Sequence, residues 1–435
     1  MGDHSSICCG SLTIVRNITE RSGCLLEMQD SEMILYPAEQ NAPINQRRVY
    51  LDQSVYGRML STGNWRESPI GTVLLEAQAA GRAQVWAGPT NVIEAIQAPN
   101  PITRKDLASM MLDLIEARRM WWGYEFEAVA DFLRFVEQVA PEGIRHHEYF
   151  DDRCVTAQQT WLGALALLAS TNGEHLGPLA KSLQHTKALN RLLHARFALA
   201  PDEWVDRMAF AAERFDTTDT DRFTYLEKLT IDEVEREIEE LSAQAVKLDR
   251  ATATKLDKRR RTVPKAYGAA EIGEMLQAII HLPLELQLTF DVPHIISRWP
   301  DVQRTTGCES LPKDIVQTDE RDKLADASIA HRVIEQLIRA SGRKGLLTTY
   351  LGAEVIILEM QRCMNSEKIP TGGLTFDADH AAALVRHHVF VTHDELLLAS
   401  LKTMSKRVEE QTEDQWKPEV VDTPKQLKRV LSRSI

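Results

Sequence analysis

The sequence predicts an α/β protein in which a central, mostly parallel sheet is joined to a large all-helical segment. Two short apolar runs, Val49–Leu51 and Val389–Val391, lie near opposite ends of the 435-residue chain. Both are typical of buried strands, because parallel strands covered by helices on both faces are apolar throughout. A third strand-like run, Gln84–Ala87, is followed at once by a helix start. From residue 121 to 367 the apolar side chains recur at helical spacing nearly throughout.

Strands and helices are expected to alternate through residues 47–120. A helix is predicted from Ser68 to Ala80, because proline suits the first turn of a helix and a glycine, here Gly81, suits the position just past its end. A second helix is expected to begin at Pro89 and a longer one at Pro101. This alternation is the pattern of a parallel sheet with crossover helices.

The remaining elements are mostly helical. Trp161–Leu168 is typical of a buried helix, while Leu226–Leu256 is rich in charge and is expected to form one long helix that projects as an arm. An alanine-rich helix beginning near Thr375 leads into the strand that ends at Val391.

Acidic residues stand where these strands and helices meet. Ligands of parallel α/β sheets gather outside the carboxyl ends of the strands, so acids at those positions point toward a common crevice. Taken singly, a strand-ending aspartate is usually a helix cap, and acids in a first helical turn are stabilised by the helix dipole by about 0.3 to 1 kcal/mol. The informative feature is the series along the chain: Asp52, Glu94, Asp377, Asp379 and Asp394.

The order of these motifs resembles that of PIN-like nuclease domains, which are metal-dependent ribonucleases with a flavodoxin-like αβα core. The shared pattern is a strand followed by Asp52, a strand and helix with Glu94, the segment Asp377-Ala-Asp-His-Ala-Ala, and Val-Phe-Val-Thr-His-Asp394. The resemblance implies that these four acids form the catalytic, metal-binding set. It further implies that Ser54 and the hydroxyl of Thr392 contribute to substrate binding.

The resemblance covers roughly residues 47–120 and 368–435, and it implies two halves of one domain. Glu94 and Asp377 are 283 positions apart (377 − 94), far more than an ordinary PIN domain places there. Residues 121–367 are therefore expected to be a helical insertion, which loop-closure entropy permits because its cost grows only logarithmically with length. Residues 1–46 are expected to be an N-terminal extension to which no chemistry is assigned.

Carboxylates brought into one crevice favour a bound cation, since a close pair repels by about 4 kcal/mol at 4 Å in an effective dielectric of about 20. Oxygen ligands suit Mg²⁺ or Mn²⁺, with Asp379 as a fifth candidate ligand. Nearby histidines follow no familiar zinc spacing. His380 is expected to pack or hydrogen-bond beside the acids, and His393 to contact substrate.

The net charge of −12 gives no general affinity for nucleic acid, so positive charge must be concentrated locally. Candidates are the basic stretch 255–265 and the C-terminal lysines and arginines, of which Lys402 lies two helical turns past Asp394. The expected partner is nucleic acid, with RNA favoured by the resemblance. A protein partner at the helical insertion and homo-oligomers are further expectations, since PIN-like domains often pair.

No apolar run approaches the roughly 20 residues that span a bilayer, so no membrane association is expected. Six cysteines without regular spacing, and no secretion signal at the start, predict reduced thiols in a cytoplasmic protein. Two functions stay open. The first is an active metal-dependent endoribonuclease; the alternative is a catalytically inactive PIN-like scaffold whose helical insertion binds protein or RNA.

Overall fold

A computed structural model describes residues 46–145, 148–171, 176–201, 229–244, 249–259, 289–319, 326–370, 373–412 and 416–433, together with 272, 276 and 323. The predicted N-terminal extension, apart from Gln46, and residues 260–265 of the basic stretch lie outside this set. None of the helices in the described part combines the length and the apolar character that crossing a bilayer requires.

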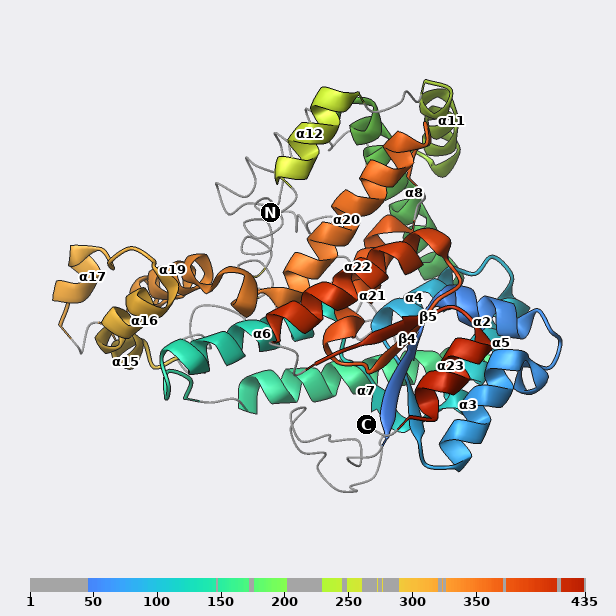
Figure 1. The fold of residues 1–435 in the computed structure, drawn as a ribbon, viewed down its shortest axis with the longest axis horizontal. Helices are drawn as coiled ribbons and strands as arrows, with labels where there is room; N and C mark the ends of the chain where they lie inside the picture. The colour runs from blue at the N-terminus through green and yellow to red at the C-terminus, as the bar shows by residue number, and fades with distance from the viewer. Residues whose placement is uncertain are drawn as a thin grey trace.

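A parallel sheet lies at one end of the molecule (Figure 1). Its strand order is β3-β2-β1-β4-β5, and every pairing between neighbours is parallel. The strands are β1 (Arg47–Leu51), β2 (Ala83–Ala87), β3 (Ile115–Met120), β4 (Val389–Val391) and β5 (Glu419–Val421). The α/β class and the parallel sheet predicted from the sequence are confirmed.

The strand order differs from the flavodoxin order 2-1-3-4-5 that the expected flavodoxin-like core implies. From β1 the chain adds β2 and β3 on one side and later β4 and β5 on the other. The order therefore reverses between β1 and β4, which are adjacent although most of the chain separates them. Such a reversal is the point at which α/β sheets open a ligand crevice beyond their carboxyl ends.

Helices fill the connections between the strands. The helices of the first half are α2 (Gln53–Leu60), the short η1 (Trp65–Glu67), α3 (Pro69–Ala79), α4 (Pro89–Gln97) and α5 (Pro101–Leu114). The helices that follow β3 are α6 (Tyr124–Val139), α7 (Glu148–Thr171), α8 (Gly177–Leu199), α11 (Ile231–Ser242), α12 (Arg250–Arg259), α15 (Val292–Ser297), α16 (Trp299–Thr306), α17 (Lys313–Gln317), α19 (Ala327–Gly345) and α20 (Leu347–Asn365). The C-terminal ones are α21 (Leu374–Ala382), η4 (Ala383–Val385), α22 (Glu395–Gln411) and α23 (Pro424–Leu431).

The structure confirms several of the helix starts and stops that the sequence predicts. Ser68 caps α3 by accepting a hydrogen bond from the amide of Gly71, and Gly81 follows the helix at φ +64°, a conformation that favours glycine. Proline occupies the first turn of α3, α4, α5 and α23, where its missing N–H would have no partner within the helix.

Side chains of the strands alternate between two cores on opposite faces of the sheet, as the two-residue period of a strand requires. Tyr50, Trp86 and Phe390 enter one core with α6, α19, α20 and α22. Leu51 and Val85 enter the other with α2 to α5, α7, α8 and α23. The segment 121–367 thus supplies helices to both cores, while α15, α16, α17 and α19 extend away from the sheet (Figure 1).

The expectation of one long helical arm over Leu226–Leu256 is wrong. Its described residues form two helices, α11 and α12. Asp249 starts the second by accepting hydrogen bonds from two amides of its first turn, and α11 buries Val234 and Ile238 against α8 instead of projecting. Apolar burial at helical spacing fixes α11 to the body of the protein.

Strand β3 was not predicted as a strand. Its sequence, Ile-Glu-Ala-Arg-Arg-Met, has neither an apolar run nor strict alternation. The strand lies at the edge of the sheet, where charged residues are common because they discourage pairing with another chain. Local sequence therefore gave no signal for it.

Candidate metal centre

Asp52 is held at the point where β1 and β4 end. The hydroxyl of Thr392, directly after β4, donates a 2.8 Å hydrogen bond to Asp52 Oδ2, and the hydroxyl of Ser54 donates to the same oxygen. Thr392 also accepts a 3.0 Å hydrogen bond from the amide of Asp394, and Ser54 accepts one of 3.0 Å from the amide of His393. These contacts fix the Asp52 carboxylate beyond the carboxyl ends of β1 and β4, where the strand order reverses.

Ser54 and Thr392 both direct their hydroxyls at Asp52, and the substrate binding that the resemblance implied for them stays a prediction. Thr392 is fully buried, and both hydroxyls are used on Asp52. We assign them a positioning role: hydroxyl donors keep one carboxylate oxygen occupied and leave Oδ1 facing the crevice.

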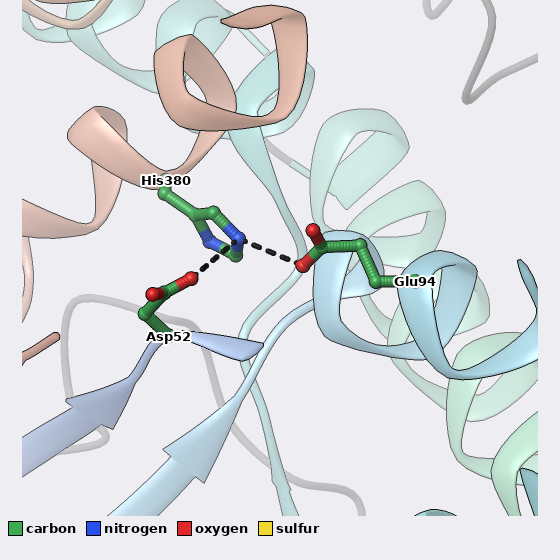
Figure 2. Close-up of side chains that lie close together, drawn as sticks. All are labelled: Asp52, Glu94 and His380. Atoms are coloured by element: carbon green, nitrogen blue, oxygen red, sulfur yellow. Dashed lines mark hydrogen bonds and ion pairs between the residues drawn. The ribbon is translucent and has the colours of Figure 1, made fainter. Parts of the chain in front are cut away.

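His380 lies between Asp52 and Glu94 (Figure 2). Its Nε2 is 3.0 Å from Glu94 Oε2 and 3.6 Å from Asp52 Oδ1. One ligand atom from each of the three side chains falls within 4.8 Å of the others, a spacing at which they could hold a metal ion. The three residues come from the end of β1, from α4 and from α21, so folding alone brings them together.

The ring of His380 is fixed on its other side as well. Its Nδ1 lies 3.0 Å from the hydroxyl of Tyr50, a fully buried residue of β1. Burial on its own lowers the pKa of His380, but the hydrogen bond and charge of Glu94 and the charge of Asp52 outweigh it and raise that pKa above its usual value. In the absence of a metal ion, the histidine is the basic group of this pocket.

Asp377 lies in the same acidic environment, although it does not belong to the group of three. Burial raises its pKa well above the usual range, and the charges of Glu359, Asp52, Glu94 and Asp394 raise it further. Four acids from distant segments of the sequence thus act on Asp377. Asp377 stands in the first turn of α21, as predicted.

Glu359 is an acid of this site that sequence reasoning missed. It lies on α20, is only 4% exposed, and hydrogen-bonds to Asp377 and to Ser400. Burial raises its pKa to about 7, and the charge of Asp394 acts in the same direction. Its Oε1 has no hydrogen-bond partner among the described residues, which is costly for a buried carboxylate oxygen. The sequence signal that could have identified Glu359 is its position as an acid among the apolar residues of α20.

Asp394 caps α22. Its Oδ1 accepts hydrogen bonds of 2.8 and 2.9 Å from the amides of Leu396 and Leu397. The sequence allowed that a strand-ending aspartate caps a helix, and this is correct for Oδ1 of Asp394. The charge of Asp394 also raises the pKa of Asp377 and of Glu359. Asp394 adds negative charge to the cluster. In the described structure it is not a member of the group of ligand atoms that Asp52 and Glu94 form within 4.8 Å.

Three further predicted residues lie at the margin. Asp379 is half-buried on α21 and is not in the group of three, although its charge acts on Tyr50. The ring of His393 hydrogen-bonds to the backbone of Asp422, and partial burial, with Arg58 nearby, lowers its pKa. Lys402 is exposed on α22, about 12 Å beyond Asp394 at a rise of about 1.5 Å per residue.

Among the described residues, Arg362 acts on Glu359 and hydrogen-bonds to Ser400, but arginine and lysine side chains do not pair with the other four acids of the cluster. In the part of the chain that the structure describes, no ion pair joins either type of residue to Asp52, Glu94, Asp377 or Asp394. Glu127 shows the contrast, because this fully buried acid contacts both Arg386 and Arg134. Carboxylates that have a histidine but no arginine or lysine partner, with an unpartnered buried oxygen on Glu359, fit the needs of a divalent cation.

A comparison with known protein families, with curated proteins and with solved structures gave no match for this chain. The resemblance to PIN-like domains therefore rests on the motifs and their order.

Proposed function

We propose that this protein is a metal-dependent nuclease with a PIN-like core, acting as an endoribonuclease on phosphodiester bonds. One observation carries the proposal. Carboxylate oxygens of Asp52 and Glu94 lie within 4.8 Å of each other around His380, beyond the carboxyl ends of the strands, and the charges of Asp52, Glu94 and Asp394 all act on Asp377. In the described structure none of these four acids pairs with an arginine or lysine. A scaffold gains no stability from such repulsion, whereas a cation site needs it.

The order of the acids along the fold supports the PIN-like assignment. Asp52 follows β1, Glu94 lies on the helix after β2, Asp377 on the helix before β4, and Asp394 just after β4. The proposed insertion, residues 121–367, then enters between β3 and α21. Its helix α20 contributes Glu359, which makes it part of the site.

The chain's own residues prepare the site for Mg²⁺ or Mn²⁺. Ser54 and Thr392 orient Asp52, and Glu94 faces the same pocket from α4. Asp377 and Glu359 share a hydrogen bond at its far side. When bound, the ion would activate a water molecule and neutralise charge on the phosphate under attack.

Helix α8 provides the local positive charge that an acidic nuclease requires. It carries four cationic side chains, Lys181, Lys187, Arg191 and Arg196, and neither Asp nor Glu. Of these, Arg196 pairs with Glu237. The acidic helix α11 packs on α8, and the described ion pair between them uses Arg196. Phosphate contacts supply most of the affinity of a protein for nucleic acid, so Lys181, Lys187 and Arg191 are the proposed phosphate contacts.

The position of α8 supports this role. It packs on α4 and α20, the helices of Glu94 and Glu359. The ammonium of Lys187 lies 5.4 Å from the ring centre of Phe376, the residue before Asp377. A nucleic acid held along α8 would approach the acids directly. Because Lys187 lies against the residue before Asp377, α8 is the nucleic-acid-binding surface in this proposal.

The inactive scaffold remains the second candidate, and the capping hydrogen bonds of Asp394 favour it, since they give that acid a structural role without a metal ion. In this alternative the protein has no catalytic activity, and its helical segment binds protein or RNA. The two candidates differ in whether a divalent ion stabilises the protein.

Asp52→Asn tests the proposal. We expect wild type to cleave RNA with Mn²⁺ and to gain thermal stability from the ion, and we expect the variant to lose both. Asp52 caps α2 by accepting a hydrogen bond from the amide of Ser54. Asp326→Asn is the matched control, because Asp326 caps α19 in the same way but lies outside the acidic cluster. No cleavage and no stabilisation of wild type by Mn²⁺ or Mg²⁺ would favour the scaffold. Single-stranded DNA of the same sequence tests the preference for RNA.

A further inference from the structure

We propose that His380 is a ligand of the bound ion through Nε2, and that the site therefore selects Mn²⁺ or another transition-metal dication over Mg²⁺. The inference rests on the metal dependence proposed above and changes the ligand set that the sequence predicts. In place of carboxylates alone, the first ligands are Asp52, Glu94 and His380.

The distances suit such a site. Ligand atoms held about 2.0 to 2.2 Å from one ion at tetrahedral or octahedral angles are about 3 to 3.5 Å apart. His380 Nε2 is 3.0 Å from Glu94 Oε2 and 3.6 Å from Asp52 Oδ1. The ligand atoms of Asp52 and Glu94 also lie within 4.8 Å of each other. An ion at the centre of the group would replace the hydrogen bond between His380 and Glu94.

The orientation of the ring matches that of a metal-binding histidine. Such histidines place their second ring nitrogen on a protein group that fixes the tautomer. The hydroxyl of Tyr50 lies 3.0 Å from Nδ1 and is fully buried. With the proton on Nδ1 donated to this hydroxyl, the lone pair of Nε2 faces Asp52 and Glu94, as Figure 2 shows for the ring.

The donor set decides the preferred metal. Magnesium prefers oxygen ligands and binds imidazole poorly, whereas imidazole suits transition metals. Asp377 and Asp394 stand outside the group of three, and the Oδ1 of Asp394 is occupied by two backbone amides. A site with one nitrogen and two carboxylates among its nearest ligands favours Mn²⁺ over Mg²⁺.

Pulsed electron paramagnetic resonance on the full-length protein with Mn²⁺ tests this directly. We expect a nitrogen coupling from a directly bound imidazole in wild type and its loss in His380→Gln, with an at least tenfold weaker Mn²⁺ affinity. Tyr50→Phe should keep the coupling and weaken Mn²⁺ binding about 10- to 100-fold. His387→Gln is the matched control, since His387 is equally buried but hydrogen-bonds to a backbone carbonyl of Ala383.

The outcomes separate the two proposals. Bound Mn²⁺ without nitrogen coupling in wild type would overturn the role of His380 and leave the metal-dependent function standing. Absence of any Mn²⁺ binding would overturn both. Because the wild-type spectrum alone decides the first point, the test does not depend on whether a variant folds.

Discussion

Replacing Glu359 by Gln should stabilise the protein in chelator, and it should do so only above about pH 5. The substitution keeps the shape of the side chain and removes its charge. Burial raises the pKa of Glu359 from its ordinary value of 4.5 to about 7, so ionising this group lowers the free energy of unfolding. The difference corresponds to about 3 kcal/mol, at about 1.4 kcal/mol for each pH unit.

The sign of the effect follows from proton binding. Between pH 4.5 and 7 the folded state holds a proton on Glu359 that the unfolded state has lost, so wild-type stability falls as pH rises through this window. Glutamine does not titrate. The variant should therefore exceed wild type by up to about 3 kcal/mol at pH 8 and by little at pH 4.5, with Asp377 sharing part of the effect through its hydrogen bond to Glu359.

Urea unfolding in EDTA, followed by circular dichroism from pH 4.5 to 8.5, measures this difference. A gain of equal size at both ends of the range would show that packing, not charge, is responsible, and a loss at pH 8 would refute the reasoning. Added Mn²⁺ should stabilise wild type more than the variant. Glu354→Gln is the control, because this fully buried acid on the same helix faces Arg407 outside the cluster and should leave the response to Mn²⁺ unchanged.

Three further changes test other parts of the site and fold. Thr392→Val removes a buried donor to a charged carboxylate, so unfolding experiments should show a loss of about 1 to 3 kcal/mol and RNA cleavage assays a lower rate. Lys187→Glu should weaken RNA binding in fluorescence anisotropy and reduce its salt slope by about one, whereas Lys428→Glu on α23 should not. Arg386→Gln removes one of the two arginines that pair with Glu127, and because Arg134 remains it should cost about 1.5 to 3 kcal/mol in urea unfolding at pH 7. Because Arg386 and Arg134 outweigh burial and lower the pKa of Glu127, that cost should shrink as pH falls below 4.5 and the carboxyl becomes protonated.

The amino-acid sequence by itself determined the class of fold and the acids that flank its central strands. Apolar runs identified β1 and β4, and proline, serine and glycine marked the ends of α3, because strand burial and helix capping are local properties. The same local signals placed Asp52 and Asp394 just after these strands. Side-chain periodicity could not reveal β3, a charged edge strand held by its pairing with β2.

Only the tertiary structure decided which side chains meet. Glu359 comes from the middle of an apolar helix, and His380 comes between Asp52 and Glu94 because α21 packs beside the end of β1. The hydroxyl of Thr392 meets Asp52 because β4 pairs with β1, and the hydroxyl of Ser54 donates to the same carboxylate oxygen. These contacts depend on how helices dock on the sheet, and docking is set by burial summed over the whole chain, which no short motif records.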